Sequence, residues 1–260
     1  MEKKGPRGFD TFYKSHFGDR WEGLKASLME ETKPVGFEEG LLTTYFLDEA
    51  SIFCARTLEV QPDDLVLDLC AAPGGKTLVI ASCLGPEGQL VSNEKSPDRK
   101  RRLQKVLSEH LGETQRKVRV TGFDATRWGL YEQGLYDRVL LDAPCSSERH
   151  VIHSKTHLDL WSPARTKHLA IQSFSLLAAG LEALKPGGVL VYSTCALSPL
   201  ENDGVIEKLF KKREGQFKLE TIEFSFGEKT KYGILILPDQ CQGRGPLYMA
   251  KISKTQPSPE

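Results

Sequence analysis

Two cysteines of this chain, Cys145 and Cys195, are candidates for covalent catalysis. Cys145 follows the run Leu-Leu-Asp-Ala-Pro, and Cys195 follows Val-Tyr-Ser-Thr. Each run begins apolar and turns polar, which is typical of a buried strand that ends just before the cysteine. A thiolate is a strong nucleophile, and ligands of an open parallel sheet bind outside the carboxyl ends of its strands. We therefore expect both thiols in one site, where their positions alone allow either to attack.

Four acids also stand at the ends of apolar runs, namely Asp68, Glu94, Asp124 and Asp142. A single acid of this kind is usually a solvated surface charge, but four at strand ends favour a binding site. An acid that ends the second strand of a dinucleotide fold accepts the ribose hydroxyls, and this is the role we expect of Glu94. Asp124 is placed to accept from an adenine amino group.

The segment Asp-Leu-Cys-Ala-Ala-Pro-Gly-Gly-Lys-Thr at 68–77 follows the first strand and opens a helix. It matches neither of the two common glycine-rich phosphate-binding patterns, because no glycine stands five residues before Gly75. Gly74 and Gly75 permit a tight turn and the close approach of a ligand to backbone N–H groups. An ordinary strand-to-helix turn is the alternative interpretation.

The elements that position these residues alternate between strand and helix. Strands are predicted at 65–70, 89–94, 118–123, 139–142, 189–194, 218–224 and 247–252. Helical or loop-helix stretches separate most of the first five, which is the pattern of a Rossmann-like, doubly wound parallel sheet of the α/β class.

Serine–proline pairs mark three predicted helix starts, at 96–97, 162–163 and 198–199, because serine caps a helix and proline suits its first position. Glu201 stands three residues after Ser198, which predicts a capping box. The glycines of 185–188 are expected to end the long helix before the next strand.

The N-terminal part has a different pattern. Residues 9–33 carry apolar side chains at mostly helical spacing and predict a small helical appendage, residues 34–44 predict a link, and a helix is expected across 47–58. We therefore divide the chain into an appendage and link at 1–44, one domain at 45–254 and a tail at 255–260.

Composition narrows the function classes. Lys plus Arg and Asp plus Glu are both 35 in 260 residues, so the net charge is zero and a polyanionic partner must meet a local basic patch. The six cysteines form no Cys-x-x-Cys pair, which predicts a reduced protein with no metal site. The first residues lack an apolar signal segment, and no apolar run reaches membrane-spanning length. We expect a cytoplasmic monomer that does not enter a membrane.

Three motifs carry a resemblance to a known family: Cys-Ala-Ala-Pro-Gly-Gly-Lys at 70–76, Asp-Ala-Pro-Cys-Ser at 142–146 and Tyr-Ser-Thr-Cys at 192–195. With them, the chain from about Tyr45 to Lys254 resembles the Sun-domain family of S-adenosylmethionine-dependent RNA cytosine-5 methyltransferases. Two further segments, Phe-Gly-Asp-x-Trp at 17–21 and Gly-Pro-x-Tyr at 245–248, are similar to the mitochondrial ribosomal-RNA member.

The resemblance implies a class I methyltransferase fold with one antiparallel strand, here 247–252, and S-adenosylmethionine as cofactor. It implies that Cys195 is the nucleophile, that Cys145 helps to release the product and that Asp142 touches the target base. The cofactor contacts that it implies are Cys70, Ala71, Ala72, Pro73, Gly74, Gly75, Lys76, Glu94, Arg99, Asp124 and Asp142.

This assignment suits the chemistry, because carbon 5 of cytosine is a poor nucleophile until a thiolate adds to carbon 6. A buried Asp142 with a raised pKa would then donate a proton to nitrogen 3. The Cys195 thiolate needs support, which we expect from Lys76 and from the start of the helix near Ser198. The other four cysteines are expected to be small buried hydrophobic residues.

The chain departs from the family in three ways. No glycine follows Ser146, Glu94 replaces the more usual Asp, and no separate RNA-binding domain is expected. Ribosomal RNA is the expected substrate, transfer RNA the runner-up, and an RNA-binding ribosome-assembly factor is the alternative from a different class. Amino-group methylation ranks below these, because Ala-Pro-Cys follows Asp142 instead of Pro-Pro and an aromatic residue.

Basic runs stand at 95–102 and 208–213, but such runs are usually solvated helix faces, so the loop at 149–155 is the better candidate for RNA contacts. The target base must leave its stack to reach a pocket thiol, which favours a single-stranded site. Because the net charge is zero, we expect that an accessory protein could supply part of the affinity for RNA.

Overall fold

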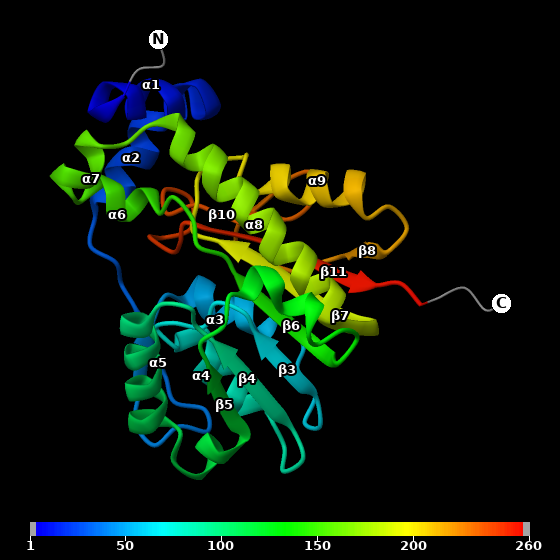
Figure 1. Ribbon diagram of the computed structural model, residues 1–260. Helices are drawn as coiled ribbons and strands as arrows, with labels where there is room; N and C mark the ends of the chain where they lie inside the picture. Colours follow the sequence, from blue (N-terminus) through cyan, green and yellow to red (C-terminus); the bar gives the residue numbers. More distant parts are fainter. Residues whose placement is uncertain (1–3, 257–260) are drawn as a thin grey trace.

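A nine-stranded sheet forms the centre of the protein (Figure 1). The structure is a computed structural model that describes residues 4–256. Five parallel strands follow one another in the order β5, β4, β3, β6, β7. Their bounds are Leu65–Asp68 for β3, Gln89–Asn93 for β4, Val118–Thr121 for β5, Tyr136–Asp142 for β6 and Leu184–Thr194 for β7. The order reverses between β3 and β6, which is where ligands of such sheets bind.

The sheet continues with antiparallel pairing beyond β7. Strand β11 (Leu247–Lys254) runs antiparallel to β7, with Tyr248 opposite Thr194. This confirms the predicted antiparallel strand and the mostly parallel α/β fold. The strands β8 (Phe217–Glu220) and β10 (Ile234–Ile236) both pair with β11, and β9 (Glu228–Lys229) pairs with β10. Strands β9 and β10 were not predicted, because two or three residues show no periodicity.

Alternation along the strands divides the interior into two cores. Val66 faces the helices α3, α4 and α5, whereas the next residue, Leu67, faces the opposite core. The helices of the first layer are α3 (Glu49–Arg56), α4 (Gly75–Cys83) and α5 (Pro97–His110). The other face is covered by α8 (Pro163–Ala183), α9 (Asp203–Lys212) and the short helix η3 (Ala125–Leu130). Helices on both faces are what a sheet of parallel strands requires.

The predicted N-terminal helices form a third core with segments that follow β6 and β7. The appendage consists of α1 (Gly5–Phe17), η1 (Gly18–Arg20) and α2 (Trp21–Met29), which contact α6 (Glu148–Ile152) and α7 (Lys155–Asp159) (Figure 1). Trp21, Leu24 and Leu28 are fully buried and share this core with Trp161 and Leu197. The appendage is thus packed beside the loops that carry Cys145 and Cys195.

The predicted link contains structure of its own. Strand β1 (Val35–Phe37) pairs antiparallel with β2 (Tyr45–Leu47). The pairing connects the predicted link with the predicted domain across the boundary at residue 44. The boundary itself stays a prediction. The short helix η2 (Gly112–Lys117) precedes β5. Part of the predicted tail, 257–260, lies outside the described residues.

Two of the three predicted helix starts are confirmed, at Pro97 and Pro163, and the Ser96 hydroxyl accepts from the Arg99 N–H. The capping box at Ser198 is wrong, because α9 begins only at Asp203. Glu201 does not cap a helix; its carboxylate accepts from Ser146, 55 residues away. The segment 185–188 was predicted as a turn, but it is already part of β7.

Candidate active site

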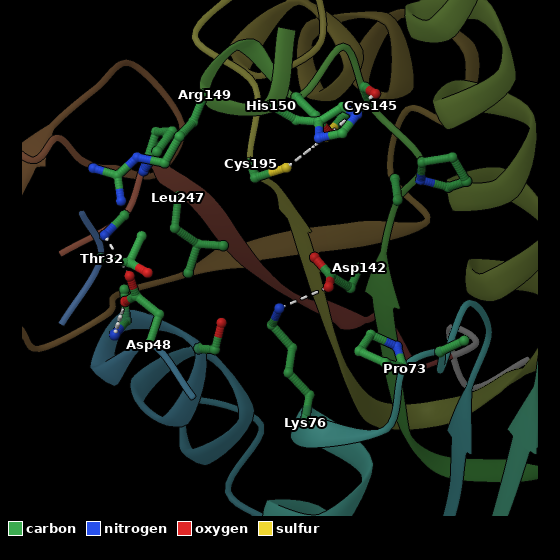
Figure 2. Close-up of a pocket in the computed structure, with 18 of the residues that line it drawn as sticks. Thr32, Asp48, Pro73, Lys76, Asp142, Cys145, Arg149, His150, Cys195 and Leu247 are labelled. Atoms are coloured by element: carbon green, nitrogen blue, oxygen red, sulfur yellow. Dashed lines mark hydrogen bonds and ion pairs between the residues drawn. The ribbon is translucent and has the colours of Figure 1, made fainter. Parts of the chain in front are cut away.

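Neighbouring parallel strands bring the two predicted thiols together. Strands β6 and β7 run side by side with Asp142 opposite Ser193, and each cysteine follows the end of one of them. The Sγ atoms of Cys145 and Cys195 lie 3.0 Å apart, and both residues are free thiols (Figure 2). The prediction of two thiols in one place is confirmed.

The surroundings of the two thiols shift their pKa values in opposite directions. A hydrogen bond from the Cys145 thiol lowers the pKa of Cys195, burial opposes this, and Ser147 lowers it further. The same hydrogen bond, together with burial, raises the pKa of Cys145. The Ser147 Oγ atom lies 3.2 Å from Cys195 Sγ and 3.5 Å from Cys145 Sγ. These contacts favour Cys195 over Cys145 as the thiolate.

Lys76 and Asp142 form an ion pair below the thiols. The Lys76 Nζ atom donates to Asp142 Oδ2 across 2.6 Å, and Ser193 Oγ donates to Asp142 Oδ1 across 3.0 Å (Figure 2). Burial alone would lower the pKa of Lys76, but Asp142 outweighs it and raises the pKa. The Asp142 side chain is 34% exposed, so the condition of burial, on which its role as a proton donor depended, is not met. With two donors its carboxylate is held as an acceptor.

A cavity of about 960 Å³ opens over these residues. Of the predicted site residues, it is lined by Ala72, Pro73, Lys76, Arg99, Asp142, Cys145 and Cys195. Its walls also include residues 30–32 after α2, the start of α3, residues of α6 and the segment 245–247. A volume of this size is typical of a ligand site, and the groups that do chemistry lie together on its surface.

The loop after β3 lines a smaller cavity of about 110 Å³, with Cys70, Ala71, Gly75 and Asp68 in its wall. Asp68 is 1% exposed, and burial raises its pKa to about 7. Its Oδ2 atom accepts from the Thr77 hydroxyl at 2.8 Å, whereas its Oδ1 atom is buried without a hydrogen-bond partner. An orphaned buried carboxylate oxygen marks a place where a donor belongs.

The two glycines of this loop serve the packing of the loop itself. Gly74 has a φ of +124°, as expected for a tight turn, and a Cβ there would lie 3.1 Å from Val106. A Cβ at Gly75 would lie 3.0 Å from the Tyr45 ring. Gly75 lines the smaller cavity, and the close approach of a ligand to this loop stays a prediction.

Glu94 lies just beyond β4 and is 5% exposed. Its Oε1 atom accepts from the Ser96 N–H at 2.8 Å, and its Oε2 atom has no hydrogen bond, although Arg99 lies 3.2 Å from it. Arg99 donates to the Ala72 carbonyl at 2.6 Å and so joins Glu94 to the loop after β3. The buried Asn93 amide holds the ends of three strands together by donating to the carbonyls of Leu69 and Phe123.

Asp124 has its acceptors occupied. It accepts from Lys95 at 2.7 Å and caps η3 through Thr126, and these bonds lower its pKa to about 2. Gly74, Glu94 and Asp124 line neither of the two cavities. The adenine contact of Asp124 stays a prediction.

The expected support of the Cys195 thiolate by a helix start near Ser198 is wrong, since α9 begins at Asp203. Lys76 remains a source of positive charge, because the fields of Lys76 and Cys195 act on each other. Ser147 and Cys145 supply the contacts that the sequence did not predict.

Two buried glutamates behind the thiols were also missed. Glu148 and Glu201 are fully buried, and among the ion pairs formed by residues 4–256 none involves either of them. Glu148 accepts from the Tyr13 hydroxyl and, at 2.9 Å, from the Leu197 N–H. Glu201 accepts from the Ser146 N–H at 2.8 Å. Together they connect the loop of Cys145, the loop of Cys195 and the appendage, contacts that no local pattern reveals.

Of the four cysteines expected to be buried, Cys54 and Cys241 are buried and Cys70 is half-buried. The expectation is wrong for Cys83, which is exposed at the end of α4. Across residues 4–256, no group of three or more His, Cys, Asp and Glu is arranged to hold a metal ion.

The expected RNA contacts differ in their relation to the cavity. Arg149, His150 and His153 line it, whereas of the basic run at 95–102 only Arg99 does. Within that run, Lys95 is paired with Asp124 and Arg101 with Asp98. In the part of the chain that the structure describes, no helix is long and apolar enough to span a membrane.

Comparison with known proteins adds a family match. A family model described as 16S rRNA methyltransferase RsmB/F matches residues 55–253. The chain is 38% identical over 234 residues to the 5-cytosine rRNA methyltransferase NSUN4 of Bos taurus, covering 83% of this chain and 60% of that protein. It is 33% identical over 221 residues to a mitochondrial tRNA (cytosine(34)-C(5))-methyltransferase of Mus musculus, covering 81% and 63%. The chain thus spans less than two thirds of these relatives' length.

Solved structures agree with the fold. NSun6 from Pyrococcus horikoshii, determined with the S-adenosylmethionine analogue SFG, superposes with a TM-score of 0.72 at 30% identity, covering 85% of this chain and 55% of that one. A methyltransferase homologue from the same organism gives a TM-score of 0.77 at 23% identity, covering 95% and 94%. The second likeness supports the architecture alone.

Proposed function

The chain belongs to the RsmB/F family of 16S rRNA methyltransferases, and from that premise we propose that it transfers a methyl group from S-adenosylmethionine to carbon 5 of a cytosine in RNA. The observation that carries this proposal is the pair of free thiols 3.0 Å apart, in one cavity with Asp142 and Lys76. Methylation of an amino group needs no such pair.

Cys195 is the nucleophile of this proposal. Its Sγ atom adds to carbon 6 of the cytosine, and the electrons of the 5,6 double bond become available at carbon 5. The choice of Cys195 over Cys145 rests on its lowered pKa, which keeps more thiolate near neutral pH.

Asp142 orients the ring, because its carboxylate is held by Lys76 and Ser193 at the edge of the cavity. A carboxylate accepts from the exocyclic amino group of cytosine and stabilises the positive charge of a ring protonated at nitrogen 3. Lys76 keeps this carboxylate in place and adds positive charge near the sulfur.

Cys145 assists release. After carbon 5 has gained its methyl group, the proton on that carbon must leave, so that the 5,6 double bond re-forms and the C–S electron pair returns to Cys195. Cys145 accepts this proton directly or through water, once its own proton has passed to solvent in the open cavity.

The residues around the loop after β3 fit the cofactor. S-adenosylmethionine supplies the methyl group from its sulfonium when bound. Asp68 Oδ1 and Glu94 Oε2 are buried acceptors without a hydrogen bond, suited to donors such as an ammonium or ribose hydroxyls. The contacts proposed beside them are residues 70–76, Arg99, Asp124 and Asp142.

Ribosomal RNA is the substrate that we favour, because the family description and the NSUN4 relative both name it. Transfer RNA is the second candidate, since a relative at 33% identity bears that name. A purely scaffolding role does not account for two thiols in contact. A monomer, a cytoplasmic location and an accessory RNA-binding protein stay predictions, and one relative is mitochondrial by name.

The test is methyl transfer from labelled S-adenosylmethionine to small-subunit ribosomal RNA and to transfer RNA, with bisulfite sequencing of the product. Wild type should label cytosine carbon 5 in ribosomal RNA. The Cys195→Ala variant should be inactive, and Cys145→Ala should retain RNA in a denaturation-resistant adduct. Full activity of Cys195→Ala would refute the mechanism, and labelling of transfer RNA alone would refute the substrate.

A further inference from the structure

Ser147 is a non-glycine residue with a left-handed backbone, at φ 52° and ψ 60°. Such a conformation is uncommon for residues with a Cβ and persists where the surroundings over-determine it. It lies between the loop of Cys145 and helix α6, and its side chain faces both sulfurs.

The residues on either side fix this conformation. The preceding residue, Ser146, is held by Glu201 through its N–H at 2.8 Å and its hydroxyl at 2.7 Å. The following residue, Glu148, is held by Leu197 and by the Tyr13 hydroxyl. The strained residue is thus clamped between two buried carboxyl groups.

The Ser147 hydroxyl completes a triangle with the thiols. Its Oγ atom lies 3.2 Å from Cys195 Sγ and 3.5 Å from Cys145 Sγ, while the sulfurs lie 3.0 Å apart. It also lies 3.4 Å from the Cys145 carbonyl, an acceptor in its own loop. When Cys195 is a thiolate, the hydroxyl has a stronger acceptor within reach.

Resting on the proposed function, we propose that Ser147 is a further catalytic residue, whose hydroxyl donates a hydrogen bond to the Cys195 thiolate before attack and again at release. At release the C–S bond breaks and its electron pair returns to Cys195 Sγ, while the carbon-5 proton passes to Cys145. Cys145 must lack its proton to accept this one, so it cannot then donate to Cys195. Ser147 does not titrate near neutral pH and is the donor that remains.

Other charged and titratable groups face Cys195, and they are the same in every variant compared below. They are Lys76 on α4, Asp142 on β6, Cys145, Glu148, Arg149, His150 and His153 from the loop and helix after β6, and Glu201 after β7. Differences between the variants therefore report on residue 147.

The experiment measures alkylation of Cys195 by iodoacetamide against pH in the full chain, with the labelled peptide quantified by mass spectrometry. Ser147→Gly is the test variant, because glycine adopts positive φ without strain and removes only the side chain. Gln242→Gly is the matched control, since Gln242 also has a positive φ of 56°.

Ser147→Gly should raise the midpoint of Cys195 alkylation by about one pH unit, the size expected for one hydrogen bond to a charged group. Single-turnover methyl transfer should fall about tenfold. Gln242→Gly should leave both unchanged. An unshifted midpoint in Ser147→Gly, or an equal shift in Gln242→Gly, would overturn the role of Ser147. A shift in a protein whose wild type methylates no RNA would support the hydrogen bond from Ser147 to the Cys195 thiolate, but it would refute the proposed function and with it the catalytic role.

Discussion

The Lys76 ammonium lies 2.6 Å from the Asp142 carboxylate, and the two side chains come from the helix after β3 and the end of β6. Both line the cavity that contains the thiols. The pair therefore spans the point where the strand order reverses, and it joins the loop proposed for the cofactor to the residue proposed for the base.

Replacement of Lys76 by Met should lower the single-turnover rate of methyl transfer by about 100-fold, because Asp142 and Cys195 both lose their positive neighbour. The matched control is Lys25→Met, whose ammonium pairs with Asp10 at 2.7 Å on the appendage. Equal rates in the two variants would contradict the proposed role of Lys76.

Stability should depend on pH through Glu201. Burial and the nearby Glu148 raise its pKa from 4.5 to about 8 in the folded protein. The folded state therefore binds more protons than the unfolded state between these values. The contribution of Glu201 to stability is complete below pH 4.5 and is lost as the pH rises through 8. Over this range the free energy of unfolding changes by at most about 1.4 kcal/mol per pH unit.

Glu201→Gln mimics the protonated acid and should flatten this dependence, so that the variant gains on wild type as the pH rises from 5 to 8. Urea unfolding at a series of pH values measures the difference. Glu220→Gln serves as the control, since Glu220 is exposed. A constant difference between wild type and Glu201→Gln would show that Glu201 is ionised throughout.

The appendage should contribute to the stability of the whole chain. Leu24 is fully buried in the third core, and Leu24→Ala should cost about 2–5 kcal/mol of unfolding free energy. Leu160→Ala is the matched control, because Leu160 is 77% exposed and should change the stability by less than about 0.5 kcal/mol. Equal effects in chemical denaturation would mean that the appendage unfolds separately.

The glycine at the turn after β3 should not tolerate a side chain. Gly74→Ala combines a positive φ with contacts at 3.1 Å to Val106 and 3.2 Å to Leu103. Gly134→Ala has a positive φ of 58° but no atom within 4 Å of the new Cβ. Gly74→Ala should therefore be less stable than Gly134→Ala by about 1–3 kcal/mol. Thermal unfolding of both variants decides this, and the reverse order would exclude the packing argument.

The site residues that could be predicted from the sequence are those at the ends of strands. The carboxyl ends of parallel strands share one edge, so the position of Asp142 after one strand and of Cys195 after the next was enough to bring them together. Ser96 capped its helix as predicted, because that signal is local.

Side chains whose hydrogen-bond partners lie far away in the sequence were predicted wrongly or not at all. The spacing of Ser198 and Glu201 fits a capping box, but the carboxyl group of Glu201 binds Ser146 in another loop. No pattern in the chain brings Glu148 to Tyr13 across 135 positions. Ser193, which donates to Asp142, could have been predicted as a site residue, because it stands two residues before Cys195.

The cavity walls come from distant parts of the chain, with residues 30–32 on one side and 245–247 on another. During synthesis the early helices leave the ribosome long before β11, the strand that carries Leu247 beside the thiols. Contacts of such wide sequence separation form late in folding, because loop closure must precede them. A nascent chain that lacks β11 therefore holds Cys145 and Cys195 without the wall that residues 245–247 give their cavity.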